Sequence, residues 1–184
     1  MKKYSPIKGS SYIPLPKFIE NKKACINVRN EDNQCFKYAI LSALHPCETN
    51  AHRVNQYRKY EHELQFDNIE FTVKLKDISK FEKLNNISMK AYMLRKFGGK
   101  YEVSPCHVTE DKKEKHVNLL IVQDFYIDEH EENNCGDEVN LPRYHYVWIK
   151  SLSRLLKSQL SKSHVKSNHC ERCFTAKKNY KCMN

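Results

Sequence analysis

The chain has 184 residues, 40% of them hydrophobic and 11% aromatic, which is enough for one domain of ordinary size with a tail but not for two full domains. Its longest apolar stretches are far shorter than the roughly 20 residues of a membrane-spanning helix, so the sequence excludes a transmembrane protein. The net charge of +10 is uneven: residues 150–184 contain nine Lys and Arg and one acid, a net of +8, and 10 − 8 leaves only +2 for residues 1–149.

Residues 1–23 are predicted to form an irregular lead-in, because three prolines and several lysines disfavour a long element there. A short strand is expected at residues 25–28. The clearest helix covers residues 34–45, where apolar side chains recur at the i, i+3, i+4 and i+7 positions that place them on one face. Asp32 or Asn33 is a suitable N-cap for this helix, and a proline follows its end.

A second helix is predicted at residues 51–64, and both helices are expected to pack on a sheet. The middle of the chain has strand-like segments at residues 71–75, 87–94 and 101–103. A helical or looped stretch at residues 78–84 separates the first two of them.

The strongest strands come late, at residues 116–123 and 144–150. In the second of them, alternation with a period of two places His145, Val147 and Ile149 on one face. These two strands are expected to be neighbours in the core.

Between the two strands, residues 124–138 hold seven acids and no Lys or Arg, which is the composition of a solvated loop. Leucines at helical spacing predict a last helix at residues 151–160. The sequence therefore predicts a lead-in at 1–23, an α+β domain at 24–150 whose helices pack on a mostly antiparallel sheet, and a basic helix and tail at 151–184.

Eight cysteines are scattered through the chain without a signal peptide, which favours reduced thiols over a disulfide framework. An intracellular location, nuclear or cytoplasmic, is the expectation. Four of the cysteines show no ligand spacing and are interpreted as ordinary thiols: Cys25, Cys47, Cys106 and Cys135.

Cys35 lies in the first turn of the clearest helix, where unpaired N–H groups and the positive end of the helix dipole stabilise a thiolate. A nucleophilic thiolate also needs a base within hydrogen-bond reach, and His145 is the candidate if the two elements meet. The alternative is that Cys35 is a packed core residue and that His145 has a structural role.

The string DNQCF, which runs from Asp32 to the residue after Cys35, resembles the Asp-x-x-Cys-[Leu/Phe] signature of OTU-like cysteine proteases. His145 and the tyrosine after it resemble the late His-aromatic pair of that family. Many OTU-like enzymes carry a polar residue two positions after the histidine, whereas this chain has Val147 there, so Asp124 is the candidate that orients the imidazole.

The resemblance implies a papain-like or OTU-like fold and an acyl-transfer mechanism. In that mechanism Cys35 attacks an amide carbonyl, His145 moves the proton, and backbone N–H groups near Asp32 and Cys35 hold the oxyanion. A peptide or a ubiquitin-like protein would be the substrate.

Seven short strings are spread over most of the chain: YIPLP from Tyr12, KACINV from Lys23, DNQCF from Asp32, KFEKLN from Lys80, HVNLL from His116, HYVWIK from His145 and LSRL from Leu152. Together they resemble the region upstream of the polymerase in Polinton/Maverick-type and adintovirus-like family-B DNA polymerase polyproteins. This resemblance implies an accessory domain of a mobile element, here as a fragment or truncated copy, because the exonuclease and polymerase modules of that family are not in this sequence.

Near the C-terminus, Cys170 and Cys173 form a C-x-x-C pair of the kind that supplies half of a zinc site. Cys182 is a candidate third ligand, and His169 or His164 a candidate fourth. An unstructured basic tail without metal is the alternative.

The sequence therefore leaves three functions open. The first is a cysteine protease or deubiquitinase that uses Cys35 and His145. The second is a non-catalytic module that binds nucleic acid through the basic residues 150–184. The third is a structural remnant without activity, and the separation of Cys35 from His145 in the folded chain is expected to distinguish the first from the others.

Overall fold

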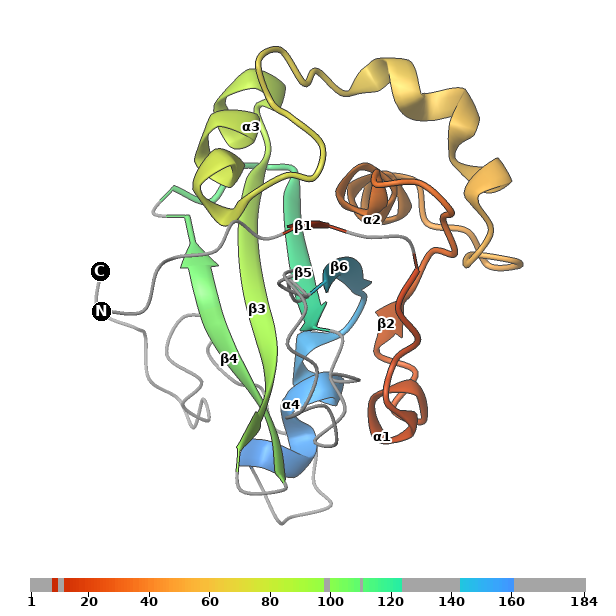
Figure 1. Cartoon of the computed structure of the whole chain (residues 1–184), viewed down its shortest axis with the longest axis vertical. Helices are drawn as coiled ribbons and strands as arrows, with labels where there is room; N and C mark the ends of the chain where they lie inside the picture. Colours follow the sequence, from red (N-terminus) through yellow and green to blue (C-terminus); the bar gives the residue numbers. More distant parts are fainter. Residues whose placement is uncertain (1–7, 10–11, 98–99, 110, 124–142, 161–184) are drawn as a thin grey trace, which may run out of the picture.

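The computed structural model describes residues 8–9, 12–97, 100–109, 111–123 and 143–160, which form an α+β fold with a mixed sheet and helices packed on both faces (Figure 1). The strands follow the order β1, β6, β5, β3, β4, and β2 pairs with β6 beside this path. None of the helices in the described residues is long and apolar enough to cross a membrane.

Four long strands form the body of the sheet: β3 (Ser88–Phe97), β4 (Lys100–Val108), β5 (His116–Gln123) and β6 (Arg143–Ile149). Two short strands, β1 (Lys8–Gly9) and β2 (Cys25–Ile26), pair with β6. The prediction that the two strongest strands are neighbours is confirmed, because β5 and β6 pair antiparallel with Val122 opposite His145. The sheet is less antiparallel than expected, since β3 pairs with β5, and β1 with β6, in parallel.

One face of the sheet is covered by α2 (Cys35–Leu44), the helix that the apolar spacing predicts, and by α3 (Ile78–Asn85). The first core lies between them and the strands. Phe36 is at its centre, with ring centroids 5.1 Å from Phe81 of α3 and 5.0 Å from Tyr146 of β6. A tightly packed aromatic cluster therefore fixes the position of α2 on β6.

The opposite face is covered by α1 (Lys17–Glu20) and α4 (Leu152–Leu160), which enclose a second core. Leu155 and Leu156 are fully buried there, and Ile19 is 1% exposed. Strands β5 and β6 are apolar on both faces, so each face needs a helical cover. The predicted boundaries at residues 23 and 150 thus do not separate the fold from its flanks, because α1 and α4 complete its second core.

The predicted helix at residues 51–64 is replaced by two 3-10 helices, η1 (Val54–Gln56) and η2 (Arg58–Glu63). Few apolar side chains are available to hold a longer helix, and Tyr57 is the one fully buried residue between the two elements. Its hydroxyl donates to the Ala51 carbonyl at 2.7 Å, which ties the segment to its own start. Local contacts therefore favour short turns over an amphipathic α-helix.

The predicted strand at residues 71–75 is also wrong. This segment has no ladder partner and ends in the 3-10 helix η3 (Leu75–Asp77). Val73 is nevertheless buried, and its carbonyl accepts a hydrogen bond from the Tyr146 hydroxyl at 2.9 Å. The apolar residues that indicate a strand serve here to cover the first core.

Candidate functional site

Cys35 begins α2, as predicted, but its side chain is buried, with 2% of the residue exposed. Burial raises the pKa of the thiol to about 11, and the charge of Asp32 acts in the same direction. The backbone N–H groups of Tyr146 and Phe36 lower the pKa only in part. The thiol is therefore protonated at neutral pH, whereas a nucleophilic cysteine needs to be a thiolate.

His145 lies on β6 and is completely buried. Its Nε2 is 2.8 Å from Oδ1 of Asn27, and its ring meets the Tyr12 ring edge-on with centroids 5.9 Å apart. Asn27 in turn donates to the carbonyl of Ile13, a member of the second core. The imidazole thus connects β6 to the segments on either side of α1.

The structure does not bring the side chains of Cys35 and His145 together. Cys35 belongs to the first core with Tyr146, whereas Val147 and Ile149 belong to the second. Because successive side chains of a strand point to opposite faces, His145 lies on the side of Val147, as its alternation predicts, and the sheet separates it from Cys35.

Asp32 stabilises the start of α2. Its Oδ1 accepts from the backbone N–H of Gln34 at 3.0 Å and from Nδ2 of Asn30 at 3.1 Å. The same Nδ2 also donates to the Asp32 carbonyl at 2.6 Å. These bonds hold the loop before α2 together. The N-cap residue of α2 is Gln34, so the prediction of Asp32 or Asn33 at that position is wrong.

The other predicted site residues lie outside the described residues. They are the candidate orienting residue and the four candidate zinc ligands: Asp124, His169, Cys170, Cys173 and Cys182. Zinc binding by the tail stays a prediction. Within the described ranges, no three His, Cys, Asp or Glu side chains are grouped closely enough to hold a metal ion.

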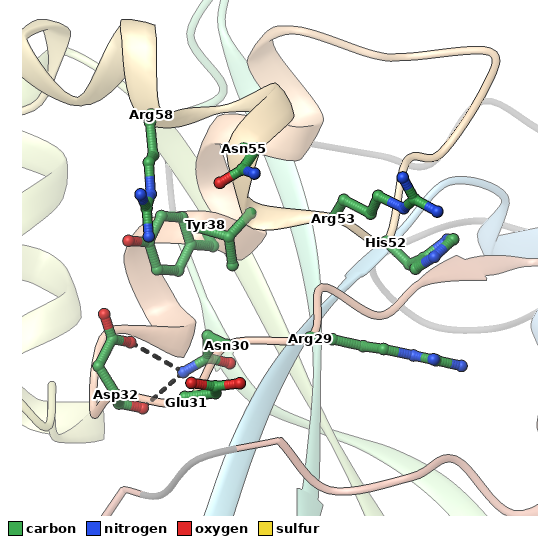
Figure 2. Close-up of a pocket in the computed structure, with 10 residues that line it drawn as sticks. Arg29, Asn30, Glu31, Asp32, Tyr38, His52, Arg53, Asn55 and Arg58 are labelled. Atoms are coloured by element: carbon green, nitrogen blue, oxygen red, sulfur yellow. Dashed lines mark hydrogen bonds between the residues drawn. The ribbon is translucent and has the colours of Figure 1, made fainter.

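A polar groove of about 670 Å³ lies beside the loop that precedes α2 (Figure 2). Residues 29–32 form one wall and residues 52–58 the other. The backbone joins the two walls, because the N–H of Arg29 donates to the His52 carbonyl at 2.8 Å and Arg29 forms a parallel bridge with Arg53. Tyr38 of α2 contributes to the lining between them.

Three exposed arginines line this groove. Figure 2 shows Arg29 and Arg53 extending toward the same end, beside His52, while Arg58 reaches toward Tyr38 at the other end. The acids in the lining are Glu31 and Asp32. Guanidinium groups with exposed donors at both ends give the groove the chemistry of an anion site.

One ion pair and one hydrogen bond hold the wall that carries Arg58 on α2. Nζ of Lys37 is 2.6 Å from a carboxylate oxygen of Glu61, and Nε2 of His45 is 2.8 Å from one of Glu63. Glu61 also accepts from the Tyr38 hydroxyl at 3.2 Å. These acids are engaged with α2, so they do not neutralise the arginines.

The described part of the chain is more basic than the whole. It contains 24 Lys and Arg and 13 Asp and Glu, and 24 − 13 gives a net charge of +11. The prediction that basicity belongs to the tail therefore needs a correction. Residues 1–149 are near neutral because the acids cluster at residues 124–138, not because the folded elements lack positive charge.

The sequence reasoning did not single out Arg29, Arg53 or Arg58. They lie on segments predicted as a polar break and a helix, and 24 positions separate the first two. The one available signal was the polar stretch at residues 29–33, which has no apolar periodicity. Only the pairing of Arg29 with Arg53 brings the three arginines to one groove.

Comparisons of this chain with protein-family models, with curated proteins and with solved structures gave no match. The fold and the geometry of the groove are therefore the basis for the function proposed below.

Proposed function

We propose that this protein is a nucleic-acid-binding module and that the groove of Arg29, Arg53 and Arg58 contacts the phosphate backbone. The observation that carries the proposal is the presence of three exposed arginines in the lining of one groove, two toward one end and one at the other (Figure 2). Guanidinium groups bind phosphate in a bidentate manner, and nucleic acid offers phosphates in a row.

The electrostatics of the fold support a polyanion as the ligand. The described elements carry a net charge of +11, which attracts nucleic acid before any specific contact forms. The three arginines outnumber the two acids of the lining, Glu31 and Asp32, so the groove keeps a positive balance. Each phosphate that an arginine neutralises releases condensed counterions, and this release supplies much of the affinity.

Such a role agrees with the resemblance to the region upstream of a family-B DNA polymerase. A module that holds DNA beside a polymerase needs phosphate contacts and no catalytic residues. The mobile-element origin is part of the proposal, and it rests on the resemblance carried by the strings that begin at Tyr12, Asp32 and His145.

A cysteine peptidase with an OTU-like fold is the weaker candidate. Its support is the place of Cys35 at a helix start, where the backbone of Tyr146 and Phe36 acts to lower the pKa of the thiol. It would require the thiol to become exposed and a base other than His145 to reach it.

The triple variant Arg29→Ala/Arg53→Ala/Arg58→Ala tests the phosphate contacts. Fluorescence anisotropy with a labelled 20-mer DNA, measured over a range of salt concentrations, gives the slope of log affinity against log salt. We expect the slope to become shallower by about 2, because each lost phosphate contact removes roughly 0.7 to 0.9.

A charge-matched control removes three exposed lysines away from the groove, Lys76→Ala/Lys83→Ala/Lys115→Ala. It lowers the net charge by the same amount, so general attraction falls equally in both variants. Equal slopes for the two triple variants would contradict a specific role of the groove.

A further inference from the structure

A pair of exposed aromatic rings lies on the face of the molecule opposite the α2 core. Phe18 of α1 and Tyr101 of β4 are stacked with centroids 4.7 Å apart and an interplanar angle of 30°. Their exposed fractions are 37% and 36%, and among the large apolar side chains that the structure describes only Val108 is also exposed, the others being buried or half-buried. Burial of the two rings would be favourable, and the fold leaves them at the surface.

A hollow of about 520 Å³ opens beside these rings. Phe18, Tyr101 and Lys22 contribute to its lining, and Glu102 is the acid in it. The volume accommodates a planar heterocycle next to the stack. A ligand with a flat ring can stack on the aromatic pair, which an aliphatic ligand cannot do.

Basic residues outnumber acidic ones on the elements next to the stacked pair, where Glu20 and Glu102 are the acids. Lys17, Lys22 and Lys23 come from α1 and the turn after it, and Arg154 and Lys157 come from α4 on the same face. Nζ of Lys22 lies 6.0 Å from the centroid of the Phe18 ring. Exposed aromatic rings among cations are the arrangement by which proteins hold unpaired bases and their phosphates.

The neighbouring sheet edge is closed to a peptide. The side-chain amide of Gln159 donates to the Val103 carbonyl and accepts from its N–H, both at 2.9 Å, so this residue of β4 cannot pair with an added strand. Two positions further, Pro105 has no N–H to offer. Recognition of a peptide by strand addition is thus disfavoured at the place where the rings lie.

We infer that Phe18 and Tyr101 form a stacking platform for an unpaired base, and that the protein prefers single-stranded nucleic acid over a duplex. The inference rests on the proposed nucleic-acid binding and adds the form of the ligand. The bases of a duplex are already stacked on one another and cannot reach the platform.

The test uses the full chain and three labelled ligands at one salt concentration: a 20-mer oligo(dT), an abasic strand of equal length, and a 20-base-pair duplex. We expect oligo(dT) to bind about 5- to 100-fold more tightly than the abasic strand, because stacking on one aromatic ring typically has an effect of this size. The double variant Phe18→Leu/Tyr101→Leu keeps the apolar bulk and is expected to lose this difference.

The variant Tyr60→Leu is the matched control, since it removes a ring that stacks on His45, in the wall that η2 places on α2. It should keep the preference for oligo(dT). Equal binding of oligo(dT) and the abasic strand by the unmodified protein, or an unchanged preference in the double variant, would overturn the platform. In either case, a steep salt dependence in the separate titration of the groove leaves the proposed function intact, whereas no binding to any of the three ligands overturns both.

Discussion

At the start of α2, two physical effects act on the Cys35 thiol in opposite directions. The backbone N–H groups of Tyr146 and Phe36 favour the thiolate, as expected at a helix N-terminus. Burial and the charge of Asp32 disfavour it, and the net result is a pKa raised to about 11. Removing the thiol from water therefore outweighs the helix start, because desolvation penalises the charged form over the whole group.

This balance predicts slow alkylation of Cys35. In the native protein at pH 7, iodoacetamide is expected to label Cys35 more slowly than the half-buried Cys47, and the rate at Cys35 should rise about tenfold per pH unit toward pH 11. The sign follows from the raised pKa, since the thiolate fraction below the pKa grows with pH. Mass spectrometry of the peptides over time measures both rates.

Urea-unfolded protein is the control for this experiment, because both thiols then have ordinary pKa values and should react alike. Faster labelling of Cys35 than of Cys47 in the native protein at neutral pH would contradict the buried thiol. It would also support the alternative function of a cysteine peptidase.

Among the elements, α4 decides where the folded domain ends, because it packs into the second core and is not part of a separate tail. Leu155 and Leu156 are fully buried against the face of the sheet that holds Val147. The carbonyl of Leu155 also accepts a hydrogen bond from Nζ of Lys22, which joins α4 to the segment after α1. Both helices are therefore needed to close the second core.

Leu155→Ala tests this role. The variant leaves a cavity in the second core, so we expect the free energy of unfolding to fall by about 2 to 5 kcal/mol. The neighbouring Arg154→Ala should change it by less than about 0.5 kcal/mol, because Arg154 is exposed. Urea unfolding followed by the emission of Trp148 measures both, and similar values would place α4 outside the cooperative fold.

The elements that the sequence predicted well are those with a strong local pattern. The helix that begins at Cys35 has a continuous apolar face, and β5 and β6 have uninterrupted β-branched and aromatic runs. The segments at residues 51–64 and 71–75 were mispredicted because polar contacts, not an apolar pattern, fix them. The Tyr57 hydroxyl bonds the Ala51 carbonyl, Lys37 pairs with Glu61, and the Tyr146 hydroxyl bonds the Val73 carbonyl.

The candidate site was less predictable than the fold. A motif gives residues that are near in the sequence, as the DNQCF string gives Cys35, but it does not give the residues that lie near them in the fold. The face on which His145 lies followed from alternation, but the face that α2 covers did not. The pairing of β3 with β5 in parallel, like the bridge between Arg29 and Arg53, joins distant segments and leaves no local signal.

At the scale of the whole molecule, charge is divided into regions of opposite sign. The described elements carry +11, whereas residues 124–138 hold seven acids. Beyond α4, residues 161–184 contain six Lys and Arg and one acid, a net of +5. Under the proposed function, both the folded elements and the segment that follows them contribute to the attraction of nucleic acid.

Truncation after Leu160 separates these two contributions. It removes a net charge of +5 and keeps α4, so the domain is expected to stay folded while the slope of log affinity against log salt becomes shallower but does not vanish. Anisotropy titrations of the full and truncated chains measure the slopes, and Trp148 emission in urea checks the fold. A complete loss of DNA binding would show that the groove cannot bind DNA without residues 161–184.

The second core joins Ile13, near one end of the described chain, to Leu156, near the other. During synthesis on the ribosome, β5 and β6 therefore emerge with one apolar face uncovered, and it stays uncovered until α4 has left the exit tunnel. Contacts of such long sequence separation form late and leave a nascent chain open to chaperones and proteases. The time that the ribosome needs to translate α4 then sets how long the nascent chain is open to proteases. The speed at which any single helix forms matters less.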